Sequence, residues 1–172
     1  MSEIDTNLLE NKIPGFAEEF AKEILQVEDY RGDLSIVVRP DSIRKLVMGL
    51  KQKFGFEVLM DLFAMDYLKW DPPTPERFAV IYNFYSLSKK RRVRLKVFLN
   101  EEKPEIDSAH DLYASANWFE REAWDLFGIN FKGHPHLKRI LCHDDFEGHP
   151  LRKDYPSDGY QRLKSAIPAA GI

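Results

Sequence analysis

Three segments in the middle of the chain carry apolar residues at alternate positions. They run from Phe56 to Ala64, from Phe78 to Phe84 and from Val93 to Leu99. Alternate side chains of a strand point to opposite faces of a sheet, so each segment predicts a strand with one face on a core. The order and spacing of the three segments favour antiparallel neighbours. The chain is therefore constrained first of all to form a sheet, antiparallel or mixed, with one covered face.

Apolar residues at helical spacing supply the elements that could cover this face. Helices are predicted over residues 14–27, 42–54 and 108–127, and a strand over residues 34–38 lies between the first two. Gly55 and Gly128 follow the second and third helices, where a glycine often ends a helix. Helices packed on one face of such a sheet define the α+β class.

The pattern changes after Gly128. Residues 129–172 contain four of the ten prolines and show no sustained apolar period. We therefore predict an α+β domain over residues 1–128 and a long irregular C-terminal extension over residues 129–172. The extension still carries apolar residues, among them Phe131, Ile140 and Leu151. Apolar residues on an extended, proline-containing segment are typical of a chain that lies along a partner protein.

Composition excludes several classes of function. The formal net charge is −3 and the isoelectric point about 6.0, which does not favour a dedicated nucleic-acid binder. Cys142 is the single cysteine, so this chain alone cannot supply the four ligands of an iron–sulfur cluster. Met1–Asp5 lacks the features of a signal peptide, and no apolar run approaches the roughly 20 residues of a membrane span. We expect any membrane association to be indirect, through partners.

The common catalytic and nucleotide-binding motifs are absent from the sequence. There is no G-x-G-x-x-G, no phosphate-binding G-x-x-x-x-G-K-[ST], no H-E-x-x-H, no C-x-x-C and no G-x-S-x-G. The usual means of binding a dinucleotide, a nucleoside triphosphate or a catalytic zinc ion are therefore missing.

The chemistry-bearing residues gather in the third predicted helix and after it. Arg121 and Asp125 are four positions apart and can pair on one helix face. Glu122 points elsewhere and is free to meet Arg139 or Arg152. The alternative is a solvated helix face followed by a loop, because exposed pairs of this kind contribute little to stability.

Taken together, these segments are recognisable. The run E-R-E-A-W-D-L-F-G-I begins at Glu120, and G-H-P, K-R-I-L and G-H-P-L-R-K-D-Y-P follow it up to Pro156. This pattern resembles the signature of the thirty-kilodalton subunit family of respiratory complex I, in the form found in bacterial NADH:quinone oxidoreductase. The predicted order of helices and strands extends the resemblance upstream to about residue 14. Cys142-His143-Asp144 departs from the pattern, at a position where a variable loop is expected.

The resemblance implies a cofactor-free structural and assembly subunit in the peripheral arm of a proton-translocating enzyme that transfers electrons from NADH to quinone. NADH, FMN, iron–sulfur clusters and quinone would be bound by partner subunits, so no catalysis is expected from this chain alone. The expected partners are hydrophilic-arm subunits, above all the large subunit of the quinone site, on the cytoplasmic side of the bacterial inner membrane. The residues expected to form the structural signature and the partner interface are Glu120, Arg121, Glu122, Asp125, His134, Lys138, Arg139, His149, Pro150, Leu151, Arg152, Lys153, Asp154 and Tyr155.

Two rival functions use other features of the same region. The equivalent subunit of a related membrane-bound hydrogenase complex would share the signature. A metal-dependent hydrolase would use the cluster of His134, His136, His143, His149 and Cys142, which fall within sixteen positions. Their spacing does not match structural zinc sites, and we expect the imidazoles of His134 and His149 to hydrogen-bond to backbone.

Two further groups are weighed outside the signature. Lys89 to Arg92, with Arg94 and Lys96, form a basic run that could bind nucleic acid. Alternation with apolar residues favours instead a solvated strand face that discourages edge pairing, or contact with an acidic neighbour. Asp61 and Asp66 could form a carboxylate pair, but no nucleophile accompanies them and we assign no catalysis.

Overall fold

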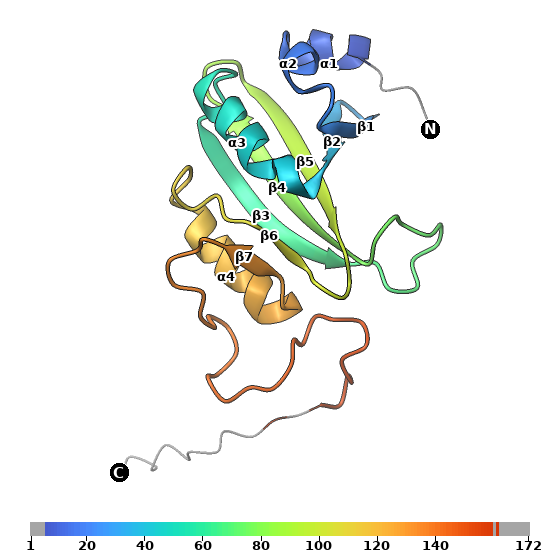
Figure 1. Cartoon of the computed structure of the whole chain (residues 1–172), viewed down its shortest axis with the longest axis vertical. Coiled ribbons are helices and arrows are strands. Elements are labelled where there is room, and N and C mark those ends of the chain that lie inside the picture. Colours follow the sequence, from blue (N-terminus) through green and yellow to red (C-terminus); the bar gives the residue numbers. More distant parts are fainter. Residues whose placement is uncertain (1–5, 160, 162–172) are drawn as a thin grey trace.

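The structure is a computed structural model and describes residues 6–159 and 161. Figure 1 shows its elements in chain order. The helices are α1 (Thr6–Lys12), α2 (Phe16–Phe20), the 3-10 helix η1 (Pro40–Ser42), α3 (Ile43–Gln52) and α4 (Ala116–Phe127). The strands are β1 (Ile24–Tyr30), β2 (Asp33–Val38), β3 (Val58–Asp66), β4 (Phe78–Ser86), β5 (Arg91–Leu99), β6 (Glu105–Asp107) and β7 (Asn130–Lys132).

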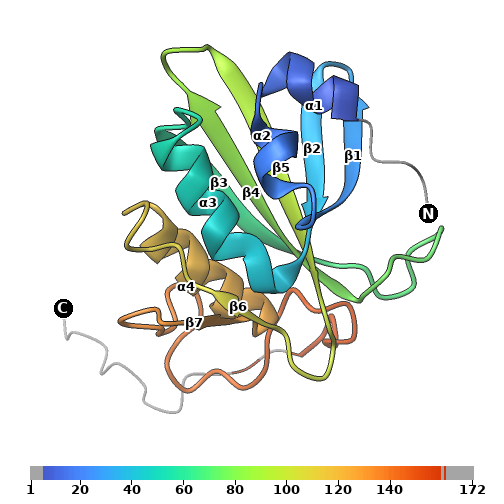
Figure 2. The same ribbon diagram turned by 45° about the horizontal axis from the view of Figure 1, so that its top comes forward.

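Five strands form one mixed sheet in the order β1-β2-β5-β4-β3. The three strands predicted from period-two alternation are β3, β4 and β5, and they pair antiparallel as expected. β2 joins them parallel to β5, and β1 pairs antiparallel with β2. Helices lie in front of the sheet in Figure 2, so the predicted α+β class is confirmed.

The main core lies between the sheet and the helices. Phe78, Val80, Tyr82 and Phe84 project into it from β4 at alternate positions, and all four are fully buried. A second, smaller cluster lies on the opposite face, where Ala79 and Ile81 from the intervening positions of β4 meet Tyr67, which follows β3.

The first predicted helix is wrong in its extent. Only Phe16–Phe20 is helical, and β1 begins at Ile24. The apolar period is real, because Phe16, Phe20 and Ile24 are all buried. However, residues 24–30 pair with β2, and hydrogen bonds to a neighbouring strand override the local periodicity. Residues 6–12 form α1, which was not predicted.

The third predicted helix begins eight residues late, at Ala116 rather than Ser108. Residues 108–115 form turns instead, in which Tyr113 donates its N–H to the carbonyl of Ala109. The strand β6 just before them pairs in parallel with β7, which lies in the extension. Phe131 of β7 is buried in the main core, so the first residues after Gly128 pack with the sheet domain.

The basic strand β5 lies inside the sheet, between β2 and β4. The expectation that its cations discourage edge pairing is therefore wrong, because β5 has no free edge.

None of the helices in the described part of the chain is long and apolar enough to cross a membrane.

Candidate functional site

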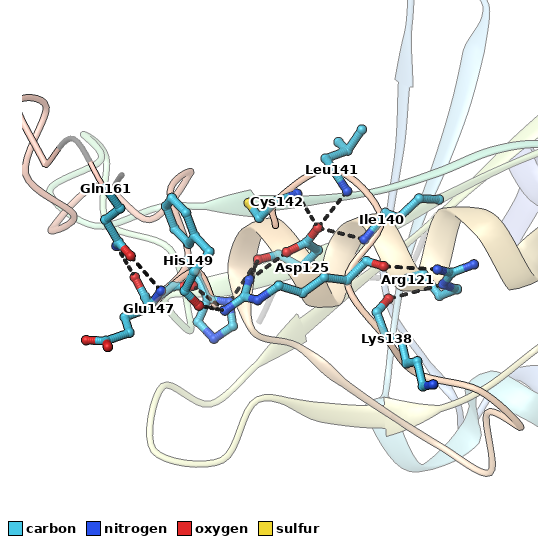
Figure 3. A network of polar contacts seen from close by, with 12 residues as sticks. Arg121, Asp125, Lys138, Ile140, Leu141, Cys142, Glu147, His149 and Gln161 are labelled. Carbon is cyan, nitrogen blue, oxygen red and sulfur yellow. Dashed lines mark hydrogen bonds and ion pairs between the residues drawn. The ribbon is translucent and has the colours of Figure 1, made fainter. Parts of the chain in front are cut away.

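Several of the signature residues meet at the C-terminal end of α4 (Figure 3). Asp125 is fully buried there. Its Oδ2 accepts the backbone N–H groups of Ile140, Leu141 and Cys142 at 2.9, 2.8 and 2.9 Å. Its Oδ1 accepts Arg139 Nη1 at 2.6 Å. Burial alone would raise the pKa of Asp125, but these four donors outweigh it and hold the pKa at about 2.

Arg139 ties a loop of the extension to the helix. Besides the ion pair, its Nη2 donates to the carbonyls of Phe146 and Gly148 at 2.6 and 3.1 Å. The guanidinium carbon lies 5.7 Å from the ring centre of Trp124 and 5.5 Å from that of Phe146. One side chain therefore joins α4 to both arms of the loop between residues 139 and 148.

The last carbonyls of α4 are also satisfied by the extension. His149 Nδ1 donates to the carbonyl of Asp125 at 2.9 Å, and Leu151 N–H donates to that of Leu126 at 3.1 Å. Arg152 Nε donates to the carbonyl of Phe127 at 2.6 Å. These carbonyls have no partner within the helix, and cations near them are favoured by the helix dipole. The extension thus caps α4.

Gly128 makes this approach possible. It follows α4 with a φ of 74°, as its predicted role at the end of the helix requires. A Cβ at this position would lie 2.5 Å from His149 Nε2 and 2.6 Å from Arg152 Nη2. We call Arg121, Asp125, Arg139, His149 and Arg152 the anchoring cluster.

Arg121 contacts the extension rather than its neighbour on the helix. Its guanidinium donates to the carbonyls of Lys138 at 3.1 Å and Arg139 at 3.0 Å. The pairing of Arg121 with Asp125 suggested by their spacing is therefore wrong, because the extension offers each of them closer partners. Glu122 is exposed, and Arg139, one of its two suggested partners, is engaged by Asp125. A solvated helix face is likewise wrong for Glu120 and Asp125, which are both fully buried.

A second set of charges fixes the extension to the far end of the β3–β4 hairpin. Arg77 donates to both carboxylate oxygens of Asp66, at 3.1 and 2.8 Å, and both side chains are almost fully buried. Asp154 of the extension adds a contact of 2.7 Å to Arg77, and Lys153 N–H donates to Asp66 at 2.9 Å. Burial acts to raise the pKa of Asp66, but Arg77 and the backbone N–H groups of Lys153 and Leu68 bring it below its usual value. Lys153 also places its ammonium 5.1 Å from the ring centre of Trp70.

Glu120 also belongs to α4, but its contacts are separate from those of the anchoring cluster. It is fully buried, and its carboxylate accepts the hydroxyl of Ser108 and the N–H of Ala109, the latter at 2.7 Å. Burial raises the pKa of Glu120 to about 7 against these two hydrogen bonds. Burial also raises the pKa of Tyr82, whose hydroxyl has no hydrogen-bond partner among the described residues, and the charge of Glu120 adds to this effect.

His134 and His149 both hydrogen-bond to backbone through their imidazoles, as expected. His134 Nε2 donates to the carbonyl of Asn117 at 3.1 Å, and His134 Nδ1 accepts the N–H of His136 at 3.0 Å. The acceptor role of Nδ1 requires a neutral ring, in accord with the burial that lowers the pKa of His134. The part of the chain that the structure describes holds no group of three or more His, Cys, Asp or Glu side chains suited to a metal ion. The hydrolase built on this cluster therefore has no support in the described geometry.

The remaining signature residues contribute less through their side chains. Lys138 and Leu151 act through their backbone groups, and Pro150 is half-buried. Tyr155 stacks on Phe146 with 5.9 Å between ring centres, and its hydroxyl donates to the carbonyl of Gly159 at 3.1 Å.

Sequence reasoning missed Arg77 and weighed Asp66 only as a partner of Asp61. Asp66 ends β3 and pairs in register with Phe78, the first residue of β4. Reading the two segments as one hairpin would have placed Arg77 beside Asp66. Asp61 instead lines a hollow with Arg92 and Arg94 and belongs to a different part of the surface.

Comparison with known proteins decides the family. The profile of the family described as "Respiratory-chain NADH dehydrogenase, 30 Kd subunit" matches residues 36–161. The chain belongs to this family. All fourteen residues predicted for the structural signature fall inside the matched range.

Individual members of the 30 Kd family align over most of the chain. An NADH-quinone oxidoreductase subunit of Geotalea uraniireducens is 46% identical over 145 residues, which cover 84% of this chain and 86% of that protein. The subunit of the same name from Rhodobacter capsulatus is 39% identical, covering 86% and 73% of the two chains.

Two solved structures share the fold. A trypsin-resistant fragment (1-134) of Nqo5 is 40% identical, covers 70% of this chain and 94% of the fragment, and superposes with a TM-score of 0.63. A chain of the archaeal membrane-bound sulfane sulfur reductase covers 92% and 96% of the two chains with a TM-score of 0.71. At 19% identity this second likeness concerns the fold alone.

Proposed function

We propose that the chain is a structural and assembly subunit of an NADH:quinone oxidoreductase, and that it holds redox-carrying partners without catalysing a reaction itself. Membership of the 30 Kd family carries the proposal. The site geometry agrees with it, because the charged groups of the anchoring cluster are used within the chain. Their carboxylates, guanidiniums and imidazoles hold the extension in place, and such groups stabilise a defined surface rather than transfer electrons or protons.

The surface fixed in this way is the proposed partner interface. Leu141 and Leu151 are 62% and 52% exposed on the anchored extension, and Trp118 is 60% exposed on α4. Large apolar side chains held outward by a rigid backbone are typical of protein–protein contacts. We assign them to neighbouring subunits of the hydrophilic arm, above all to the large subunit of the quinone site.

The division of the chain into a sheet domain and an extension is part of the same proposal. The related Nqo5 has a trypsin-resistant fragment named as residues 1–134, which supports a stable domain without the whole C-terminal part. In this chain we place the domain at residues 1–128 and the partner-contacting extension at residues 129–172. The contacts of Phe131 with the main core place the start of the extension against the domain.

NADH, FMN, iron–sulfur clusters and quinone are assigned to the partner subunits. We place the chain at the cytoplasmic side of the bacterial inner membrane, attached only through the complex. Nucleic acid is not an expected partner.

The test is affinity purification of the tagged full chain from its native membranes in mild detergent. The eluate should carry NADH:quinone activity and iron–sulfur signals, and the chain expressed alone should carry neither. Hydrogenase activity in the eluate would assign the chain to the sister complex instead. A lone protein with stoichiometric zinc would contradict both assignments.

A further inference from the structure

One face of the five-stranded sheet is left uncovered by the helices. Side chains at alternate positions of the strands point to it, opposite those of the main core. On β5 these positions are Arg92, Arg94 and Lys96. Around them lie the apolar side chains of the second cluster, including Ile81 and the half-buried Phe98. We call this the uncovered face.

The three cations of the uncovered face have no carboxylate partner among the described residues. Arg94 donates to the neutral groups Asn83 Oδ1 at 3.0 Å and Ser35 Oγ at 3.4 Å. Lys96 lies 4.8 and 4.7 Å from the ring centres of Tyr67 and Phe98. Arg92 is exposed and forms no hydrogen bond or ion pair through its side chain within the part of the chain that the structure describes.

Two more deeply buried cations of the chain have carboxylate partners. Arg77 and Arg139 both contact buried carboxylates, those of Asp66 and Asp125. Partly burying Arg94 and Lys96 without such a partner costs free energy, which a carboxylate from outside the chain would recover. Negatively charged groups of a partner could therefore pair with the cations of the uncovered face.

The face is also hollowed on both sides of Arg94. One hollow of about 300 Å³ is lined by Met60, Asp61 and Arg92 among others. A second of about 720 Å³ is lined by Trp70, Lys96 and neighbouring residues. Asp61 lines the first hollow, but among the described residues it forms no ion pair with Arg92 or Arg94.

The spacing of the cations indicates the shape of the partner. Alternate residues of a strand are separated by roughly 7 Å. An extended segment laid along β5 presents its own alternate side chains with the same repeat. We propose that the uncovered face binds an extended segment of a partner protein that carries carboxylates at alternate positions, matched to Arg92, Arg94 and Lys96. This inference deepens the proposed function and rests on it, because it assigns the segment to a neighbouring subunit of the same complex.

The experiment places a photo-crosslinking residue, p-benzoylphenylalanine, at Met60 of the tagged full chain in its native host. Met60 is 47% exposed and lines the first hollow. After irradiation of intact membranes, the crosslinked peptide is identified by mass spectrometry. We expect a segment of another subunit with carboxylates at alternate positions, and a fall of about tenfold in crosslink yield when Arg92→Glu and Arg94→Glu are combined.

Controls separate binding from folding. The double variant Lys22→Glu/Arg31→Glu reverses two exposed charges outside the β5 row and should change the yield by less than about twofold. Arg92→Glu alone spares the hydrogen bonds of Arg94 and should still lower the yield, with an unchanged thermal midpoint of the purified chain.

The outcomes distinguish this inference from the proposed function. If NADH:quinone activity co-purifies but Met60 captures no acidic segment, the inference is wrong and the proposed function stands. If an acidic segment is captured but no such activity co-purifies, the proposed function is wrong and the inference about the face stands. Capture of nucleic acid, or of a second copy of this chain, overturns the inference.

Discussion

Arg139 Nη1 and Asp125 Oδ1 lie 2.6 Å apart, with the arginine side chain 13% exposed and the aspartate side chain fully buried. The pair joins the last turn of α4 to a loop of the extension that begins fourteen residues later. A buried pair of this kind adds little over an apolar substitute, but loss of one partner leaves the other charge buried and unpaired. The order of the loop that begins at Arg139 thus depends strongly on the Asp125 carboxylate.

We expect Asp125→Ala to lower the free energy of unfolding by about 3–5 kcal/mol, the usual cost of breaking a buried ion pair. Arg139 and three backbone N–H groups would lose their acceptor at the same time. Urea denaturation followed by circular dichroism measures the change. Trypsin should also cleave faster after Arg139, because release of the loop exposes this largely buried side chain.

The matched control for this variant is Glu122→Ala, which removes an exposed carboxylate from the same helix. Its effect should stay within about 0.5 kcal/mol. Equal stability of the Asp125→Ala and wild-type chains would mean that the extension is not held by this network.

Gly128→Ala and Gly133→Ala form a second matched pair. Both glycines have positive φ, 74° and 81°, so both substitutions strain the backbone, at a cost of about 1–2 kcal/mol. Only at Gly128 would the new Cβ also collide with His149 and Arg152, whereas nothing lies within 4 Å at Gly133. Gly128→Ala should therefore destabilise the chain more than Gly133→Ala, as measured by their thermal midpoints. Equal losses would show that His149 and Arg152 move aside without cost.

The strands of the sheet were predictable because their signal is local. Each of β3, β4 and β5 carries apolar residues at alternate positions, and a register fixed by one buried face leaves little freedom. In β3 an irregularity between Leu59 and Asp61 breaks the alternation, so that Leu59 is buried and Met60, expected on the core face, is exposed. β1 was not predicted, because Ile24 and Val27 also fit a helical period and the choice depends on pairing with β2. The intrinsic preference of these residues for helix or strand cannot decide between the two structures, because the hydrogen bonds that stabilise β1 come from β2.

The anchoring cluster was predictable in its residues but not in its pairings. Asp125 and Arg121 have a good local spacing for an ion pair, yet both contact the extension instead. Such a choice is made by tertiary structure, since an i,i+4 pair is worth only about 0.2–0.5 kcal/mol. The burial of Glu120 was not predictable from the sequence either. A glutamate is rarely fully buried unless it is paired, and its partners, Ser108 and Ala109, come from outside the helix.

Glu120 should make stability depend on pH in the neutral range. Its pKa is about 7 in the folded chain against 4.5 when solvated. Between these values the folded state keeps a proton that the unfolded state has lost, so stability falls as pH rises from 4.5 toward 7. The shift corresponds to about 3 kcal/mol at most. The part of the free energy of unfolding that depends on the protonated Glu120 is fully present below pH 4.5 and is lost as the pH rises through the folded pKa.

Glu120→Gln tests this assignment. The amide keeps an oxygen for the N–H of Ala109 and does not titrate. The stability of the variant relative to the wild-type chain should therefore rise as the pH rises from about 4.5 to 7. Urea midpoints measured at several pH values across this range give both slopes. Parallel slopes would show that Glu120 is not the titrating group.

Two truncations separate the core-forming start of the extension from the rest. A chain ending after Gly133 keeps the buried Ile129 and Phe131, and with them the pairing of β7 with β6. A chain ending after Gly128 loses both side chains, and burial of one such residue contributes about 1.5–3 kcal/mol. We expect the longer fragment to unfold cooperatively and to fail in co-purification with the oxidoreductase, and the shorter one to unfold at a lower urea concentration. If the longer fragment were unfolded, the anchoring cluster would be required for folding of the sheet domain itself. If it still co-purified, the partner interface would have to lie outside residues 134–172.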